Sequence, residues 1–394
     1  MGFLEKLLES QRKHFEKGGK LEKFYPLFEA KETFLFTPST TTSGRVHVRD
    51  AINLKRVMII VVVALLPTIF FGSWNVGYQH FLAQGQSTGL AENILYGLKQ
   101  ICPIIFVSYA VGGIWEVIFA VIRKHEINEG FLVTGILFPL TLPPTMPLWM
   151  VAVSISFGVV IGKEVFGGTG MNVLNPALTA RAFAFFAYPA AMSGDSIWIA
   201  LQNVGDKVVD GFSGATALGV AASAPRGNPV TQALQASGFS LEKLFYGVVP
   251  GSIGETSTLC CLIGAAILIL TGIGRWRIMV ACVLGVYIGA TLMNFVASPS
   301  LPAIYGLPFQ WHLVLGGFAF GAVFMATDPV SAAATAMGQW IYGTLIGILV
   351  VLIRVANPAY PEGMMLAILF MNVFAPTIDH FIVKAHAKRR LVRA

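Results

Sequence analysis

A threonine hydroxyl stands in a run of small residues near the middle of the chain. The run reads Asp-Gly-Phe-Ser-Gly-Ala-Thr at residues 210–216. Its two glycines favour a turn over a helix, so we expect a loop that exposes the hydroxyl of Thr216. No neighbour in the sequence is a base that would activate this hydroxyl as a nucleophile. The residues alone therefore predict a flexible loop without catalysis by the threonine.

Carboxylates in apolar surroundings are the second group that could do chemistry. A charged side chain inside a membrane is costly, so such residues usually have a function. Hard cations prefer oxygen ligands, which a carboxylate and the freed carbonyl groups of a broken helix would supply together. Asp328 suits this role best, because Pro329 follows it and ends the helix. Four carboxylates within or at the edges of apolar segments are predicted to belong to a cation path: Glu116, Glu164, Asp328 and Asp379.

Two of these carboxylates also have plainer explanations. Glu164 follows Lys163 and could form an ion pair with it in a loop. Asp379 lies near the basic end of the chain, where it could be exposed to water. The prediction of a cation path therefore depends mainly on the other two carboxylates.

The elements that must position these groups are membrane helices. The 394 residues are 55% hydrophobic and only 12% charged, about half the charged fraction of a soluble domain. Several uncharged runs reach the roughly 20 residues that a spanning helix needs. We predict an all-α polytopic membrane protein of about ten transmembrane helices, in two inverted five-helix repeats with short broken helices. The predicted helices cover residues 57–77, 98–122, 130–142, 147–165, 175–191, 257–273, 278–297, 312–326, 337–354 and 364–383.

Basic residues mark both ends of the chain. Of 27 Lys and Arg residues, eleven lie in residues 1–56 and five in residues 384–393. Short basic loops stay in the cytoplasm, so both ends are predicted to be cytoplasmic, and the net charge of +7 reflects topology rather than nucleic-acid binding. An amphipathic helix over residues 1–20 is expected on the membrane surface or against a partner subunit. The predicted division is a basic N-terminal segment 1–56, a first repeat 57–191, an outer loop 192–256, a second repeat 257–383 and a basic tail 384–394.

Two short matches indicate an internal duplication. Leu-Val-x-Gly at residues 132–135 recurs at residues 313–316, and Asn-Pro-Ala at residues 175–177 recurs at residues 357–359. The two offsets are nearly equal, and five helices in each half would place the halves in opposite orientations. Each half then contains a short helix that a proline stops, and such helices frame ligand sites near the membrane midplane. The alternative is that the prolines only end helices at turns.

Several motifs taken together resemble those of a known family. Asp-x-x-Ser-Gly-Ala-Thr resembles the motif at which bacterial flavin transferases join the phosphate of FMN to a threonine hydroxyl. Residues 162–170, the first Asn-Pro-Ala and Ala-Thr-Asp-Pro at residues 326–329 agree with this. Over essentially its whole length, the chain resembles the family formed by the B subunits of Na+-translocating NADH:quinone oxidoreductases and the D subunits of Rnf electron-transport complexes. Its long basic opening is more similar to the quinone-reductase branch.

The resemblance implies a function that composition does not show. Such a complex oxidises NADH, passes electrons through flavins and iron centres, reduces quinone and exports Na+. The chain would carry covalent FMN, a non-covalent riboflavin and part of a quinone site, in the bacterial inner membrane. A flavin transferase would be needed for maturation, and NADH would bind a partner subunit. The implied FMN site comprises Asp210, Ser213, Gly214, Ala215 and Thr216, and the four carboxylates become candidates for the Na+ path.

Asparagine amides and a glycine pair are further candidates for cofactor contact. Asn172 and Asn175 follow a glycine-rich turn where a helix is expected to begin. An amide both donates and accepts hydrogen bonds, so it suits the edge of a riboflavin ring, and helix capping is the alternative. Gly112 and Gly113 weaken an apolar helix and allow a close approach. A neighbouring helix is the plainer partner for that approach, and a quinone or flavin edge is the alternative.

Three rival interpretations remain open from the sequence. The Rnf branch would have the same flavin but ferredoxin and NAD at the ends of the chain of electron carriers, and the long basic opening disfavours it. A channel or solute transporter on the same inverted repeat would have no covalent flavin and a polar pore. A purely structural scaffold would leave the carboxylates within the membrane unexplained.

Overall fold

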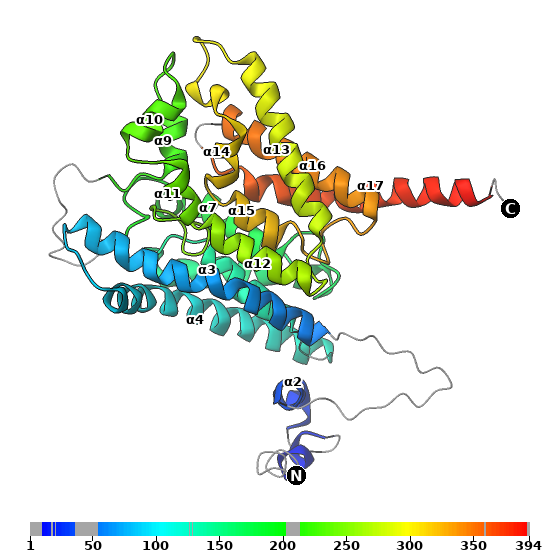
Figure 1. The fold of residues 1–394 in the computed structure, drawn as a ribbon. Coiled ribbons are helices and arrows are strands. Elements are labelled where there is room, and N and C mark those ends of the chain that lie inside the picture. Colours follow the sequence, from blue (N-terminus) through cyan, green and yellow to red (C-terminus); the bar gives the residue numbers. More distant parts are fainter. Residues whose placement is uncertain are drawn as a thin grey trace.

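Helices account for all regular secondary structure in the part of the chain that the structure describes. The computed structural model describes residues 10–16, 19, 21–35, 54–125, 127, 129–201, 213–357 and 360–391. Within these ranges there is no strand, as Figure 1 shows. Six of the described helices are long and apolar enough to cross a membrane, which confirms the predicted class. They are α3 (Leu54–Ala83), α4 (Leu90–Arg123), α6 (Leu148–Val160, with the turn that follows), α13 (Trp276–Val296), α16 (Ala336–Ala356) and α17 (Met364–Leu391).

The remaining apolar helices are too short to span alone. They are α5 (Gly130–Leu140), α7 (Pro176–Ala187) and α12 (Thr258–Leu270). Each lies where a helix was predicted, and the predicted helix over 175–191 is divided into α7 and α8 (Pro189–Met192). The count of ten spanning segments and the inverted repeat stay predictions.

The hairpin of α3 and α4 is longer than predicted. The predicted helices ended at residue 77 and resumed at residue 98, but both helices extend through most of the residues between. Buried polar side chains of this range are hydrogen-bonded, as in Gln79 and His80, so they do not end the helix. Small residues let the two helices approach closely, since a methyl group on Gly97 would lie 1.7 Å from the carbonyl oxygen of Ser73.

The predicted helix over 312–326 is interrupted. It consists of α14 (Phe309–Val314), α15 (Phe318–Phe320) and the π-helical turn η4 (Gly321–Met325). Gly316 has a φ of +60°, which a residue with a side chain rarely adopts, and this conformation lets the chain turn after α14. The fully buried Arg354 donates to the carbonyl oxygens of His312 and Leu315 at 2.7 Å each. These bonds satisfy carbonyl groups that the break leaves without helical partners.

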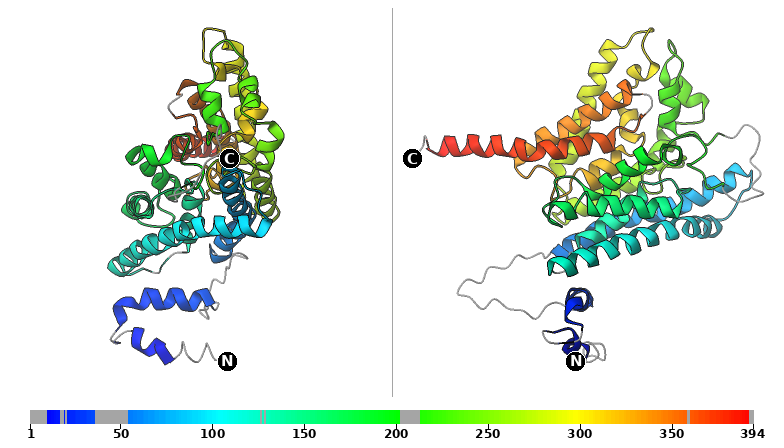
Figure 2. Two further views of the ribbon diagram at one scale, coloured as in Figure 1. Left: turned by 90° about the vertical axis from the view of Figure 1, so that its left-hand side faces the viewer. Right: turned by 180° about the vertical axis from the view of Figure 1, so that it is seen from behind.

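Three short helices lie in the segment 192–256, which was predicted to be a loop. They are α9 (Ala217–Ser223), α10 (Val230–Ala236) and α11 (Leu241–Tyr246). Figures 1 and 2 show them gathered at one side of the long helices, and α11 contacts α14. Their shortness explains why the sequence showed no clear periodicity there.

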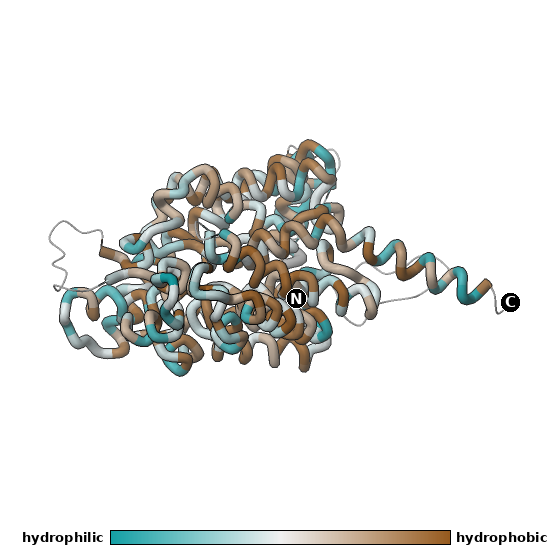
Figure 3. Tube along the Cα trace, turned by 90° about the horizontal axis from the view of Figure 1, so that it is seen from above, coloured by the Kyte–Doolittle hydropathy of each residue, from teal (hydrophilic) through white to brown (hydrophobic). Residues whose placement is uncertain are grey.

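The outer surface of the long helices is apolar. Phe70, Phe106 and Phe295 are all at least two-thirds exposed, and Figure 3 shows hydrophobic residues along much of the length of the helices. A surface of this kind is typical of contact with lipid. In Figure 1 the start of α3 and the basic end of α17 lie on the same side of the helical body. A further helix, α2 (Tyr25–Leu35), lies next to α4, and the predicted amphipathic helix of residues 1–20 lies largely outside the described residues.

Candidate functional site

A cavity of about 380 Å³ opens beside Thr216. Its walls come from α7, α9 and three irregular segments, at residues 192–198, 249–256 and 360–362. Thr216 is half-buried and begins α9, where its Oγ1 accepts a hydrogen bond from the backbone N–H of Gly219 at 3.1 Å. The hydroxyl predicted to carry FMN therefore lies on the wall of a cavity, which we call the outer cavity.

The motif before Thr216 packs against residues 193–201, which we call the wall segment. A methyl group on Gly214 would lie 2.3 Å from the carbonyl oxygen of Asp195, so only glycine allows this approach. The hydroxyl oxygen of Ser213 accepts a hydrogen bond from the backbone N–H of Ala215 at 3.3 Å. These contacts fix the loop that leads into α9. Asp210 lies outside the described residues, so its role stays a prediction.

A buried ion pair forms part of the outer cavity. Arg181 of α7 and Glu255 are 6% and 5% exposed, and Nη2 of the arginine lies 3.2 Å from Oε2 of the glutamate. A second carboxylate in the lining, Glu362, accepts a hydrogen bond from the backbone N–H of Gly317 at 2.8 Å. Burial raises the pKa of Glu255 to about 7, against the lowering effect of the guanidinium. Among the residues that line the cavity, Arg181 is thus the one cation beside the carboxylates Glu255 and Glu362, and a third carboxylate, Asp195, is exposed.

Aromatic rings supply most of the remaining recognition surface. Phe185, Trp198 and Tyr360 line the outer cavity. The rings of Phe185 and Tyr360 meet edge to face, with centroids 4.3 Å apart. A mostly apolar cavity with planar walls and a few charged groups is typical of a site for a planar ring ligand.

A second cavity, of about 80 Å³, lies between the two halves of the chain. We call it the inner cavity. It brings together residues that the sequence placed in separate groups: Lys163, Thr169, Asn172, Asn175 and Asp328 all line it. The predicted riboflavin contacts and the best predicted cation ligand therefore share one site.

Helix capping accounts for part of what the two asparagines do. Oδ1 of Asn175 accepts hydrogen bonds from the backbone N–H groups of Ala177 and Leu178, so this residue caps α7. Nδ2 of Asn172 donates to the carbonyl oxygen of Leu174 at 2.9 Å. These bonds engage only one end of each amide. The capping alternative is correct for Asn175, and cofactor contact through the other end of each amide stays a prediction.

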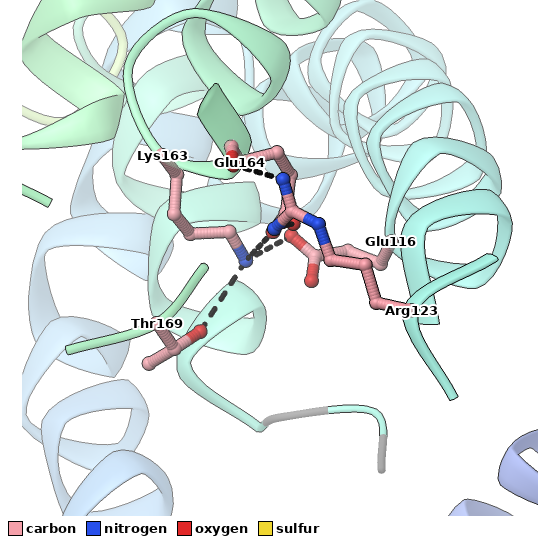
Figure 4. A network of polar contacts seen from close by, with 5 residues as sticks. All are labelled: Glu116, Arg123, Lys163, Glu164 and Thr169. Carbon is pink, nitrogen blue, oxygen red and sulfur yellow. Dashed lines mark hydrogen bonds and ion pairs between the residues drawn. The ribbon is translucent and has the colours of Figure 1, made fainter. Parts of the chain in front are cut away.

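Glu116 and Glu164 belong to one network of alternating charges, shown in Figure 4. The ammonium group of Lys163 contacts Glu116 directly and lies 3.4 Å from Glu164. Arg123 binds the other oxygen of Glu164 at 3.1 Å and its carbonyl oxygen at 2.6 Å. We call Glu116, Lys163, Glu164 and Arg123 the charge ladder. The predicted pairing of Glu164 with Lys163 is confirmed, and both carboxylates already have cationic partners.

The other two predicted carboxylates are bound by hydroxyl and N–H groups. Asp328 accepts hydrogen bonds from Ser331 Oγ at 2.6 Å and from the backbone N–H of Val330. Asp379 of α17 accepts hydrogen bonds from the backbone N–H groups of Ala334 and Thr335, at 2.6 and 3.0 Å, and from the hydroxyl of Thr335, so it holds the segment that leads into α16. Asp379 is therefore engaged with a neighbouring helix rather than merely exposed. Their part in a Na+ path stays a prediction.

The two cavities and the flavinylation-like motif lie within the region that comparison with known proteins covers. The profile of the NQR2, RnfD, RnfE family matches residues 41–388. The chain belongs to this family. It is 52% identical to the B subunit of the Na(+)-translocating NADH-quinone reductase of Stutzerimonas stutzeri, over 99% of this chain and 98% of that relative. The corresponding protein of Azotobacter vinelandii is 52% identical with the same coverage, and that of Chromohalobacter salexigens is 51% identical over 98% and 95%.

Within this member of the NQR2, RnfD, RnfE family the two glycines of α4 differ in their surroundings. A methyl group on Gly112 would lie 2.3 Å from Cζ of Phe131, so close packing with α5 explains this glycine. At Gly113 the nearest atom, also of Phe131, would be 3.9 Å away, an ordinary contact. Packing therefore requires the first glycine only, and a quinone contact at either stays a prediction.

Several charged residues of the two sites were missed as site residues in the sequence. They are Arg123, Lys163, Arg181, Glu255 and Glu362. The signal was present for Arg181, a lone charge within a predicted helix, and for Glu255, which lies just before another. Their pairing across 74 residues could not be read from spacing.

Proposed function

We propose that this chain is the flavin-carrying membrane subunit of a Na+-pumping NADH:quinone oxidoreductase. The observation that carries the proposal is the position of Thr216 on the wall of the outer cavity. The names of relatives that are about half identical along nearly the whole chain support the same assignment. The protein would work within a multi-subunit complex, in which NADH binds a partner.

The residues around Thr216 fit a flavin joined through its phosphate. The threonine oxygen is the atom that would carry the phosphodiester, and the rings of Phe185, Trp198 and Tyr360 suit an isoalloxazine ring. Arg181 offers positive charge to the polar edge of such a ring, and Glu255 holds the guanidinium in place. The flavin would supply the electron-transfer chemistry, while these residues bind it, orient it and limit its contact with water.

The inner cavity is the proposed place for riboflavin contacts. Asn172 and Asn175 both line it, and the hydrogen bonds described above engage only one end of each amide. The volume of about 80 Å³ is far smaller than that of the outer cavity. A riboflavin here would therefore need a wall from a partner subunit or movement of side chains in this chain. The quinone would be reduced beyond this point in the electron path, with Gly113 as a proposed contact.

Na+ export is proposed to involve the carboxylates of the inner half of the fold. Asp328 lines the inner cavity, and Glu116 joins it through Lys163. The protein would lie in a bacterial inner membrane with both termini in the cytoplasm. The basic ends of the chain and the shared side of the start of α3 and the end of α17 support this orientation (Figure 1).

Covalent flavin on the chain tests the proposal. The full chain is produced together with a flavin transferase, separated on a denaturing gel and viewed for flavin fluorescence. We expect a fluorescent band that Thr216→Ala removes and that Ser223→Ala, a hydroxyl change at the far end of α9, retains. A dark wild-type band, with a transferase shown to be active on another target, would overturn the flavoprotein assignment and favour the transporter.

A second experiment distinguishes the quinone-reductase branch of the family from the Rnf branch. Alignment over 95–99% of this chain and of the quinone-reductase relatives, including the long basic opening, favours the quinone-reductase branch. Membranes containing the complex should reduce quinone with NADH, with a rate that Na+ stimulates. Electron transfer between ferredoxin and NAD, without reduction of quinone, would favour the Rnf branch.

A further inference from the structure

Buried polar side chains on α3 near its Ala83 end are not explained by the sites described so far. Asn75, Gln79 and His80 are each no more than 4% exposed. Polar groups on a membrane helix are costly unless they are hydrogen-bonded, and they usually have a function. Their partners show what that function is.

His80 and Tyr96 of α4 hold a single carbonyl group together. Their rings stack with centroids 3.9 Å apart and planes at 15°. Nδ1 of His80 lies 2.7 Å and the hydroxyl of Tyr96 lies 3.0 Å from the carbonyl oxygen of Ala200. The side-chain nitrogen of Gln84 lies 3.3 Å from Nε2 of His80. Since an amide nitrogen only donates, Nε2 accepts, and Nδ1 carries the proton that is donated to Ala200.

Ala200 belongs to the wall segment of the outer cavity. Ser193, Asp195 and Trp198 of this segment line the cavity, and Gly214 rests against the carbonyl group of Asp195. The bonds to Ala200 therefore position one side of the cavity and the backbone two residues before Thr216.

The other irregular wall is attached to the same helix. Nδ2 of Asn75 donates to the carbonyl oxygen of Val249 at 3.0 Å, and its Oδ1 accepts from Gln79 at 3.3 Å, which orients the amide. Val249 is the first of four consecutive residues, 249–252, that line the cavity. A methyl group on Gly72 would lie 2.0 Å from the carbonyl oxygen of Ile253, so α3 also packs directly against this wall.

We propose that α3 sets the position of both walls of the outer cavity, with His80, Tyr96 and Asn75 as positioning residues for the flavin on Thr216. This rests on the proposed function. Both walls are held through backbone carbonyl groups by α3, with Tyr96 of α4 sharing the bond to Ala200, so the distance between the walls does not depend on the side chains that face the cavity. A wall released from α3 would admit water and give the flavin more freedom.

The test is the accessibility of the flavin in the intact complex. Iodide quenching and fluorescence anisotropy are measured for His80→Ala, Asn75→Ala and Tyr96→Phe, with the signal of the Thr216→Ala complex subtracted to remove other flavins. Losing one hydrogen bond shifts the balance between a held and a released wall by about two- to tenfold. We expect a quenching constant raised by about twofold or more for His80→Ala and Asn75→Ala, a smaller rise for Tyr96→Phe, and lower anisotropy in each.

Tyr342→Phe is the matched control. It removes a buried phenol hydroxyl that bonds to Asn372 at 2.7 Å, between α16 and α17, and should leave both signals unchanged. Wild-type quenching and anisotropy in all three variants, with a normal fluorescent gel band, would overturn the proposal. If the wild-type gel band itself is missing, the proposed function fails and not the role of α3. Tyr96→Phe removes only the hydroxyl and keeps the ring that stacks on His80. This variant therefore still tests the proposal if the alanine variants fail to fold.

Discussion

The two buried charge clusters of this chain differ in how their charges are compensated. At the outer cavity Arg181 is the one cation of the lining and pairs with Glu255, and Glu362 is a second carboxylate close to it. In the charge ladder two cations alternate with two carboxylates, and its outermost member, Arg123, is about one-third exposed. Loss of Arg181 leaves Glu255 without an ion pair among the described residues, whereas loss of one cation from the ladder leaves the other cation in place. The outer cluster is thus sensitive to any change of charge beside it, whereas the ladder resists such change.

Removing Arg181 should have the largest effect on stability. Arg181→Met leaves Glu255 buried without its cation, and breaking a buried pair from one side costs about 3–5 kcal/mol. We expect a marked fall in the thermal unfolding midpoint of the solubilised complex. The double variant Arg181→Met/Glu255→Gln should recover much of the loss, because no uncompensated charge remains on the former pair. A double variant as unstable as the single one would show that packing, and not charge, is responsible.

The same variant should be sensitive to pH in a defined direction. The pKa of Glu255 is raised to about 7, so the folded state favours the protonated carboxyl group. The stabilisation from that proton is complete at acidic pH and is lost as pH rises through 7. Without Arg181 the preference for the proton increases, so the loss of stability in Arg181→Met should be greater at pH 8.5 than at pH 6. Unfolding midpoints at the two pH values check this, and Glu255→Gln should remove the difference.

Removing Lys163 should cost less, which tests the comparison directly. After Lys163→Met the ladder still contains Arg123, which stays bound to Glu164. We expect a loss below that for Arg181→Met, measured by the same thermal unfolding. Glu116→Gln combined with Lys163→Met should restore most of it. A loss equal to that of Arg181→Met would contradict the idea that the ladder is redundant.

Local features of both clusters were predictable, and their pairing was not. The motif around Thr216 and the carboxylates in apolar segments stand out because their residue types are unusual where they occur. Helix positions followed from uncharged runs, so most predicted helices lie where the structure has them. The hairpin of α3 and α4 was predicted too short, because buried hydrogen bonds, not visible in sequence, keep its polar residues in the helix.

The features that the sequence did not predict depend on contacts between distant segments of the chain. The carbonyl group of Asp195 leaves room only for glycine at position 214, and Glu255 is the ion-pair partner of Arg181. The spacing of these residues in the sequence identifies neither partner. The segment 192–256 looked unstructured since its helices α9, α10 and α11 have only six or seven residues. Such helices are stable only through tertiary packing, which a single sequence does not display.

The glycine pair of α4, beside the ladder, separates packing from ligand contact. Gly112→Ala would press a methyl group into Phe131, and overpacking of this kind costs about 1–3 kcal/mol. Gly113→Ala meets only an ordinary contact and should leave the thermal midpoint unchanged. If quinone approaches α4 here, Gly113→Ala raises the KM for quinone at constant stability. An unchanged KM would remove Gly113 from the quinone site.

Asp379 offers the smallest and most discriminating effect, because hydrogen bonds and not cations compensate its charge. It holds the segment before α16 by accepting from the backbone N–H groups of Ala334 and Thr335. Asp379→Ala removes these bonds and should cost about 1 kcal/mol, seen as faster hydrogen exchange at the backbone N–H groups of Ala334 and Thr335. Asp379→Asn keeps one acceptor, so exchange there should change less than in the alanine variant. If Asp379 also lies on the Na+ path, both variants should lose Na+ transport equally, since both lack the charge. Transport that instead follows the exchange rates, retained in the asparagine variant and reduced in the alanine variant, would limit Asp379 to holding the segment before α16 and leave Asp328 and Glu116 as the carboxylates of the path.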